Sequence, residues 1–152
     1  MSLISKTALV TGAGQGIGRS TAQRLARAGA NLIIQDIDAD ALSETMLHLK
    51  AFNVDVLTLT GDLTEADVPE QVVQDCVKAF GGLDILFNNA GHGGAPGNIE
   101  EVDFDQYDQT MDLLLKSVFM GTQMAIPLMK KRGGGSIINM ASVASSIKGA
   151  PN

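Results

Sequence analysis

The chain has 152 residues, of which 45% are hydrophobic and 18% charged, and its formal net charge is −6. This length and composition fit one globular domain, residues 1–152, and exclude an intrinsically disordered chain. The negative charge argues against nucleic acid or an anionic membrane as a partner. A single cysteine, Cys76, excludes an internal disulfide framework. We therefore expect a cytoplasmic protein without a membrane span or a metal site.

Short apolar runs alternate with longer segments of helical periodicity, which is the pattern of parallel βα units. Strands are expected at residues 8–11, 31–35, 54–59, 84–87 and 136–140, nearly continuously apolar, as strands buried on both faces should be. Helices are expected at about 17–28, 39–51, 66–80 and 104–131. Gly121 and Pro127 are the places where the last helix could bend. The sequence therefore predicts an α/β fold with a parallel sheet.

The first strand ends in a glycine-rich turn that opens the first helix. Gly12 permits the tight turn, Gly16 lets a phosphate approach the backbone, and Gly18 allows close helix–sheet packing. The unpaired N–H groups and the positive dipole end of the helix suit a pyrophosphate. We expect dinucleotide contacts from Gly12, Gln15, Gly16, Ile17 and Gly18.

Asp36 ends the second strand, eighteen residues after Gly18. A carboxylate there can bind the adenosine ribose hydroxyls and repel a 2′-phosphate, which favours NAD(H) over NADP(H), with Ile37 as a neighbouring contact. Two alternatives remain open: a solvated loop aspartate, or the ribose site of a methyltransferase.

Asp62 follows the third strand and is placed to meet an adenine edge, while Leu63 could line the face of the ring. The alternative is the N-cap region of the next helix, since Asp62 and Thr64 precede it. Both interpretations can hold together.

Asn88 and Asn89 end the fourth strand, where buried amides must find partners, and a crossing to Thr11 is one possibility. We expect cofactor contacts from Asn89, Ala90 and Gly91, of which the last two are small enough for a cofactor to lie against the backbone. A simple turn would also place asparagine and glycine here.

Together with the segment Gly135 to Ser142, these motifs resemble the short-chain dehydrogenase/reductase family, in its common single-domain branch, over essentially the whole chain. The resemblance implies a Rossmann-type doubly wound parallel sheet in three αβα layers. The chain would supply its N-terminal portion, strands one to five, with the remaining βα units beyond. The resemblance also implies a nicotinamide cofactor, hydride exchange with a small secondary alcohol or ketone, and a homo-oligomer.

The resemblance assigns Ser142 to the serine that hydrogen-bonds the substrate oxygen. The family's Tyr-x-x-x-Lys proton donor is expected just beyond Asn152, and Tyr107 lies too early to replace it. Leu114 stands where the family usually carries an asparagine. A catalytically silent dinucleotide-binding module is therefore the second hypothesis, and a methyltransferase the third.

Overall fold

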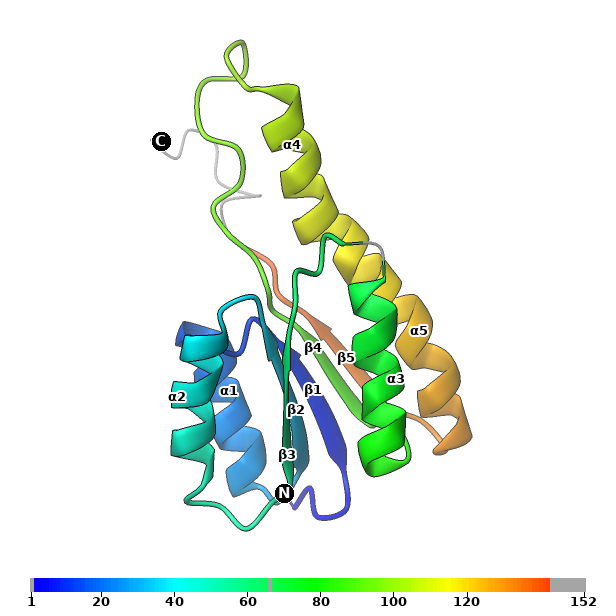
Figure 1. The fold of residues 1–152 in the computed structure, drawn as a ribbon. Helices are drawn as coiled ribbons and strands as arrows, with labels where there is room; N and C mark the ends of the chain where they lie inside the picture. The colour runs from blue at the N-terminus through cyan, green and yellow to red at the C-terminus, as the bar shows by residue number, and fades with distance from the viewer. Residues whose placement is uncertain (1, 66, 143–152) are drawn as a thin grey trace.

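The computed structural model describes residues 2–65 and 67–142. In this part of the chain, five parallel strands form one sheet in the order β3-β2-β1-β4-β5 (Figure 1). The strand order reverses between β1 and β4, which creates a crevice at the carboxyl ends of these strands. The strands are β1 (Thr7–Thr11), β2 (Asn31–Asp36), β3 (Val56–Thr60), β4 (Ile85–Asn88) and β5 (Ser136–Asn139).

Helices cover both faces of the sheet. On one face lie α1 (Gly16–Arg27) and α2 (Ala39–Leu49), and on the other lie α3 (Val68–Phe80) and α5 (Ser117–Lys131) (Figure 1). The α4 helix (Phe104–Met111) projects past the carboxyl ends of the strands (Figure 1). This arrangement confirms the predicted three-layer Rossmann-type fold.

Side chains alternate between the two faces of the sheet along each strand, and this produces two separate hydrophobic cores. Ala8 and Val10 of β1 join the cluster that α1 and α2 cover, whereas Leu9 joins the cluster that α3 and α5 cover. Successive side chains of a strand point to opposite faces, so a continuously apolar strand supplies both clusters. The expectation of burial on both faces is wrong for β3 and β5, whose residues are mostly half-buried or exposed, because these strands lie at the two edges of the sheet.

The boundaries differ from the predicted ones by one or two residues, as is usual at element ends. The third strand begins at Val56 rather than at residue 54, and α2 ends at Leu49 rather than at residue 51. The predicted start of the third helix, Ala66, lies outside the described residues, and α3 runs from Val68.

The predicted helix at 104–131 is interrupted, but not where the sequence indicated. A π-helical segment, η1 (Asp112–Lys116), separates α4 from α5, while α5 continues through Gly121 and Pro127. Gly121 has another role: a Cβ there would lie 3.2 Å from the Asn88 Oδ1 atom, so glycine lets α5 approach β4. Single-turn π segments are frequent at functional sites.

Candidate functional site

An open cleft of about 1060 Å³ lies at the carboxyl ends of the strands. Its walls come from the turn after β1, the end of β2, the segment after β3, the segment after β4, η1 and the segment after β5. It brings together every predicted site residue except Gly18: Gly12, Gln15, Gly16, Ile17, Asp36, Ile37, Asp62, Leu63, Asn89, Ala90, Gly91 and Ser142.

Gly18 lies behind the cleft and packs the start of α1 against its neighbours. A Cβ on Gly18 would clash with the Gly12 carbonyl and would lie 2.7 Å from Asn89 Nδ2. Gly12 itself has a φ of 61°, and a Cβ there would lie 2.8 Å from the Cα of Ala90. These contacts agree with the tight turn and close packing expected of the two glycines.

The N-terminus of α1 is open toward the cleft. Gln15 occupies the N-cap position without a side-chain capping hydrogen bond, and the first turn carries no acidic residue. Gly16 has a φ of 54°, and a Cβ there would meet no atom within 4 Å. Unpaired N–H groups, open space and the positive dipole end together fit an anionic group such as a pyrophosphate.

Asn89 joins the end of β4 to the end of β1. Its Nδ2 atom donates to the Thr11 carbonyl at 3.0 Å and to the Gly12 carbonyl at 3.1 Å. The backbone N–H groups of Asn89 and Ala90 donate to Thr11 Oγ1 at 3.0 and 3.1 Å. The crossing to Thr11 is therefore confirmed for Asn89.

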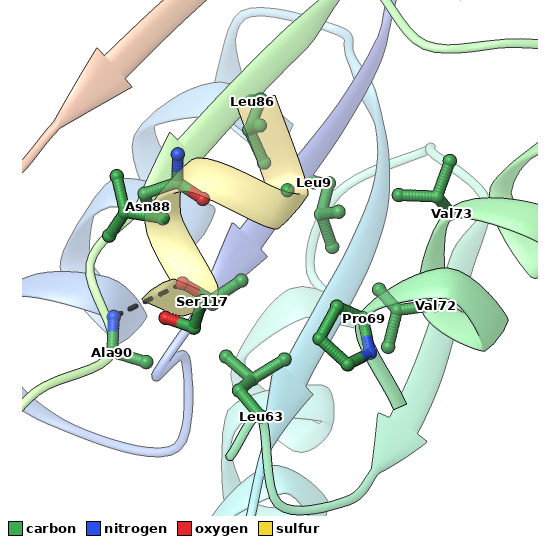
Figure 2. Close-up of a pocket in the computed structure, with 12 residues that line it drawn as sticks. Leu9, Leu63, Pro69, Val72, Val73, Leu86, Asn88, Ala90 and Ser117 are labelled. Carbon is green, nitrogen blue, oxygen red and sulfur yellow. Dashed lines mark hydrogen bonds between the residues drawn. The ribbon is translucent and has the colours of Figure 1, made fainter. Parts of the chain in front are cut away.

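Asn88 points elsewhere. Its Nδ2 atom donates to Asn139 Oδ1 at 2.8 Å, which ties β4 to β5. The two consecutive amides thus fasten β4 to both of its neighbouring strands. Asn88 lines a small pocket of about 20 Å³. Strand residues such as Leu9 and Leu86 and helix residues such as Val72 also surround this pocket (Figure 2). This volume is about that of one water molecule, too small for a substrate.

Asp36 is half-buried, and both of its oxygens accept backbone hydrogen bonds. Oδ2 accepts from the Gly14 N–H at 2.7 Å, and Oδ1 accepts from the Asp38 N–H at 3.2 Å. A purely solvated loop aspartate would have neither fixed orientation nor a place in the cleft wall. Ile37 follows with 65% of its side chain exposed at the rim.

Asp62 makes a local turn rather than a helix cap. Its Oδ1 atom accepts from the Thr64 N–H at 2.9 Å and from Thr64 Oγ1 at 2.8 Å. The N-cap position of α3 belongs to Asp67, so the capping alternative for Asp62 is wrong. Leu63, next to it, is buried and lines the cleft.

Leu114 lies on η1 and lines the cleft opposite Gly91. A Cβ on Gly91 would lie only 2.9 Å from Leu114 Cδ2. Ser142, in the segment after β5, also lines the cleft. Tyr107, on α4, is not among the described residues that line the cleft.

Several lining residues were not predicted from the sequence, in particular Gln109 and Leu113. Their four-residue spacing places them on one helix face, which is the only local signal that the sequence carries. The sequence does not show whether this face points into the cleft, because that depends on how α4 and η1 are oriented relative to the sheet. His92, in the segment after β4, also lines the cleft, and its Nδ1 atom accepts from the Gly94 N–H at 2.9 Å.

The described residues contain no cluster of His, Cys, Asp or Glu that could hold a metal ion. They also contain no helix long and apolar enough to cross a membrane. Burial raises the pKa of the Cys76 thiol to about 12, so this thiol is not activated as a nucleophile.

The strand order, the glycine turn and the cleft at the switch point define an α/β protein of the Rossmann class. The model of the short chain dehydrogenase family matches residues 6–151. The chain belongs to this family.

Curated relatives include an uncharacterized oxidoreductase of Thermotoga maritima, 40% identical over 97% of this chain and 57% of the relative. A cyclohexanol dehydrogenase of Acinetobacter sp. is 34% identical over 94% of this chain and 57% of the relative. The solved structure of an NAD⁺-bound xylitol dehydrogenase superposes with a TM-score of 0.92 at 31% identity, covering 100% of this chain and 58% of that protein. The chain thus spans somewhat more than half the length of these proteins.

Proposed function

We propose that the protein carrying this chain is an NAD(H)-dependent oxidoreductase that transfers hydride between the nicotinamide and a small secondary alcohol or ketone. Family membership and the names of the relatives support oxidoreductase chemistry on small molecules. The single observation that carries the cofactor assignment is the cleft, which unites the open end of α1 with Asp36 and Asp62. Residues 1–152 form the cofactor-binding unit in this proposal.

Each group has a role that its surroundings allow. The N–H groups after Gln15 hold the pyrophosphate, and Asp36, held by backbone bonds, receives the adenosine ribose. Asp62 and Leu63 flank the adenine. When bound, the nicotinamide supplies the hydride chemistry, and the Ser142 hydroxyl orients the substrate oxygen.

Titration with NAD⁺ and with NADP⁺ by isothermal calorimetry tests the cofactor assignment. We expect NAD⁺ to bind at least ten times more tightly, because the Asp36 carboxylate repels a 2′-phosphate. S-adenosylmethionine serves as the comparison ligand and should not bind. Equal affinity for the two nucleotides, or preference for S-adenosylmethionine, would contradict the proposal.

A catalytically silent dinucleotide-binding module is the second candidate, and Leu114 is the observation that favours it. The leucine side chain lines the cleft where the family usually carries an amide, and it offers no hydrogen bond to a proton-relay water. NAD⁺ binding without reduction in the presence of a panel of secondary alcohols would favour this second function. NADH formation with any of them would exclude it.

The proposal includes a homo-oligomer in the cytoplasm. Apolar side chains remain exposed on the outer side of η1 and α5, and they are suited to pack against a second copy: Leu115, Phe119 and Ile126. The reduced, buried state of Cys76 is compatible with a reducing compartment.

A further inference from the structure

Two side chains behind the cleft hold consecutive peptide groups of the glycine turn. Thr45 of α2 is fully buried, and its Oγ1 atom lies 3.0 Å from the Ala13 carbonyl and 3.1 Å from the Gly14 carbonyl. Arg19 of α1 donates from Nε to the Gly14 carbonyl and to Thr45 Oγ1, each at 2.9 Å. Its Nη2 atom also donates to the Gly14 carbonyl and pairs with Glu44.

The peptide that Thr45 holds is the one that orients Asp36. The Ala13 carbonyl and the Gly14 N–H belong to one planar trans peptide, so they point in opposite directions. Fixing the carbonyl toward Thr45 therefore aims the N–H at Asp36 Oδ2, which it meets at 2.7 Å. Arg19 fixes the following peptide through the Gly14 carbonyl, next to the residue at the N-cap of α1.

The glycine turn has little room to move at Gly14. A Cβ on Gly14 would lie 2.8 Å from Asp36 Oδ2 and 2.9 Å from the Cβ of Ala41, so the turn fits tightly between β2 and α2. The guanidinium of Arg19 is directed at backbone carbonyls and Glu44 rather than into the cleft, whose lining does not include it. Its positive charge is thus engaged within the protein.

We propose that Thr45 and Arg19 are positioning residues, which hold the glycine turn and, through the Gly14 N–H, set the orientation of the Asp36 carboxylate before the cofactor arrives. This inference rests on the proposed function. A carboxylate that is already held in the right orientation binds the ribose hydroxyls more tightly than one that must first be ordered, because binding then costs less conformational entropy. Neither residue is among those that line the cleft.

The variants Thr45→Val and Arg19→Met test the inference in the protein that carries this chain. Valine keeps the shape of threonine without its hydroxyl, and methionine keeps most of the arginine stem without its donors. We expect each variant to bind NAD⁺ and AMP about 3 to 10 times more weakly, since one or two hydrogen bonds to the turn are lost. Where turnover is measurable, the KM for NAD⁺ should rise while kcat stays within twofold.

Two further variants serve as controls. Thr45→Ser restores the hydroxyl and should restore NAD⁺ affinity to within twofold of the wild type. Arg24→Met removes the same charge from the exposed side of α1, where the described residues show no side-chain bond to the turn, and should leave affinity unchanged. A thermal melt of each variant checks that it is folded.

The outcomes separate this inference from the proposed function. Folded Thr45→Val or Arg19→Met protein with wild-type affinity for NAD⁺ and AMP would overturn the positioning role alone. If Arg24→Met lost as much NAD⁺ affinity as Arg19→Met, the positioning role would also be overturned. The loss would then come from the change in net charge and not from the bonds to the turn. A wild-type protein that binds neither nucleotide would overturn the proposed function, and this inference with it.

Discussion

Asp84 is a buried carboxylate at the amino ends of the strands, opposite the cleft. Its side chain is 4% exposed and accepts the Thr7 N–H at 2.9 Å, while Lys6 and Arg132 approach it at 3.1 and 2.9 Å. Burial acts to raise the pKa of this carboxyl, but the hydrogen bond from Thr7 and the two cations outweigh it and hold the pKa below its ordinary value. The residue therefore ties β1, β4 and the end of α5 together as an anion.

The lowered pKa of Asp84 predicts a loss of stability in acid. The contribution of a carboxyl with a depressed folded-state pKa is complete above its unfolded value, about 3.9, and disappears as the pH falls through the folded value. Asp84→Asn should lower the free energy of unfolding at pH 7 by about 2 kcal/mol. Its stability should also change less than that of the wild type between pH 5 and pH 3. Urea unfolding at these pH values measures both effects, and parallel acid profiles for the two proteins would contradict this role.

At the scale of the elements, η1 packs directly against the segment after β4. Gly91 and Leu114 meet at the cleft, and only the absence of a side chain on Gly91 allows the leucine to sit there. Gly91 has no left-handed backbone conformation, so space alone restricts this position. The packing of η1 therefore depends on a residue without a side chain in the segment after β4.

A double-mutant cycle tests this packing. Gly91→Ala should lower the free energy of unfolding by about 1 to 2 kcal/mol, because its methyl group overlaps Leu114. Leu114→Ala should have a smaller effect, since the leucine is 41% exposed. The double variant should regain most of the stability lost in Gly91→Ala. Additive effects in chemical denaturation would contradict a direct contact.

At the scale of the whole molecule, the described residues leave an apolar stripe exposed on the outer side of α5. Phe119 and Ile126 are 65% and 40% exposed, and their seven-residue separation places them on one helix face. Leu115, which is 59% exposed, precedes Phe119 by about one turn. Contiguous exposed apolar side chains of this kind are typical of association surfaces.

We expect the paired substitution Phe119→Gln and Ile126→Gln to reduce the mass of the assembled protein in sedimentation equilibrium. The control is Ile99→Gln, which changes an apolar residue that is 90% exposed between β4 and α4, away from the stripe. It should leave the assembly unchanged. An unaltered mass for the paired variant, or a monomeric wild type, would contradict association through this helix face.

The sequence by itself determined the order of the strands and α-helices along the chain and the cleft residues that directly follow the strands. Apolar strands, 3.6-residue helical periodicity and glycine turns are local patterns, and parallel strands bring their carboxyl ends to one edge. That is why Gly12, Asp36, Asp62 and Asn89 could be assigned to one site from their positions after the strands.

Only the tertiary structure decided which partners the polar side chains take. The sequence left Asn88 and Asn89 equivalent, yet one bonds to Asn139 of β5 and the other to Thr11 of β1. The position of the π segment and the bonds from Thr45 to the glycine turn were likewise hidden. These features depend on contacts between segments dozens of residues apart, whose distances are set by strand pairing and helix packing rather than by local periodicity.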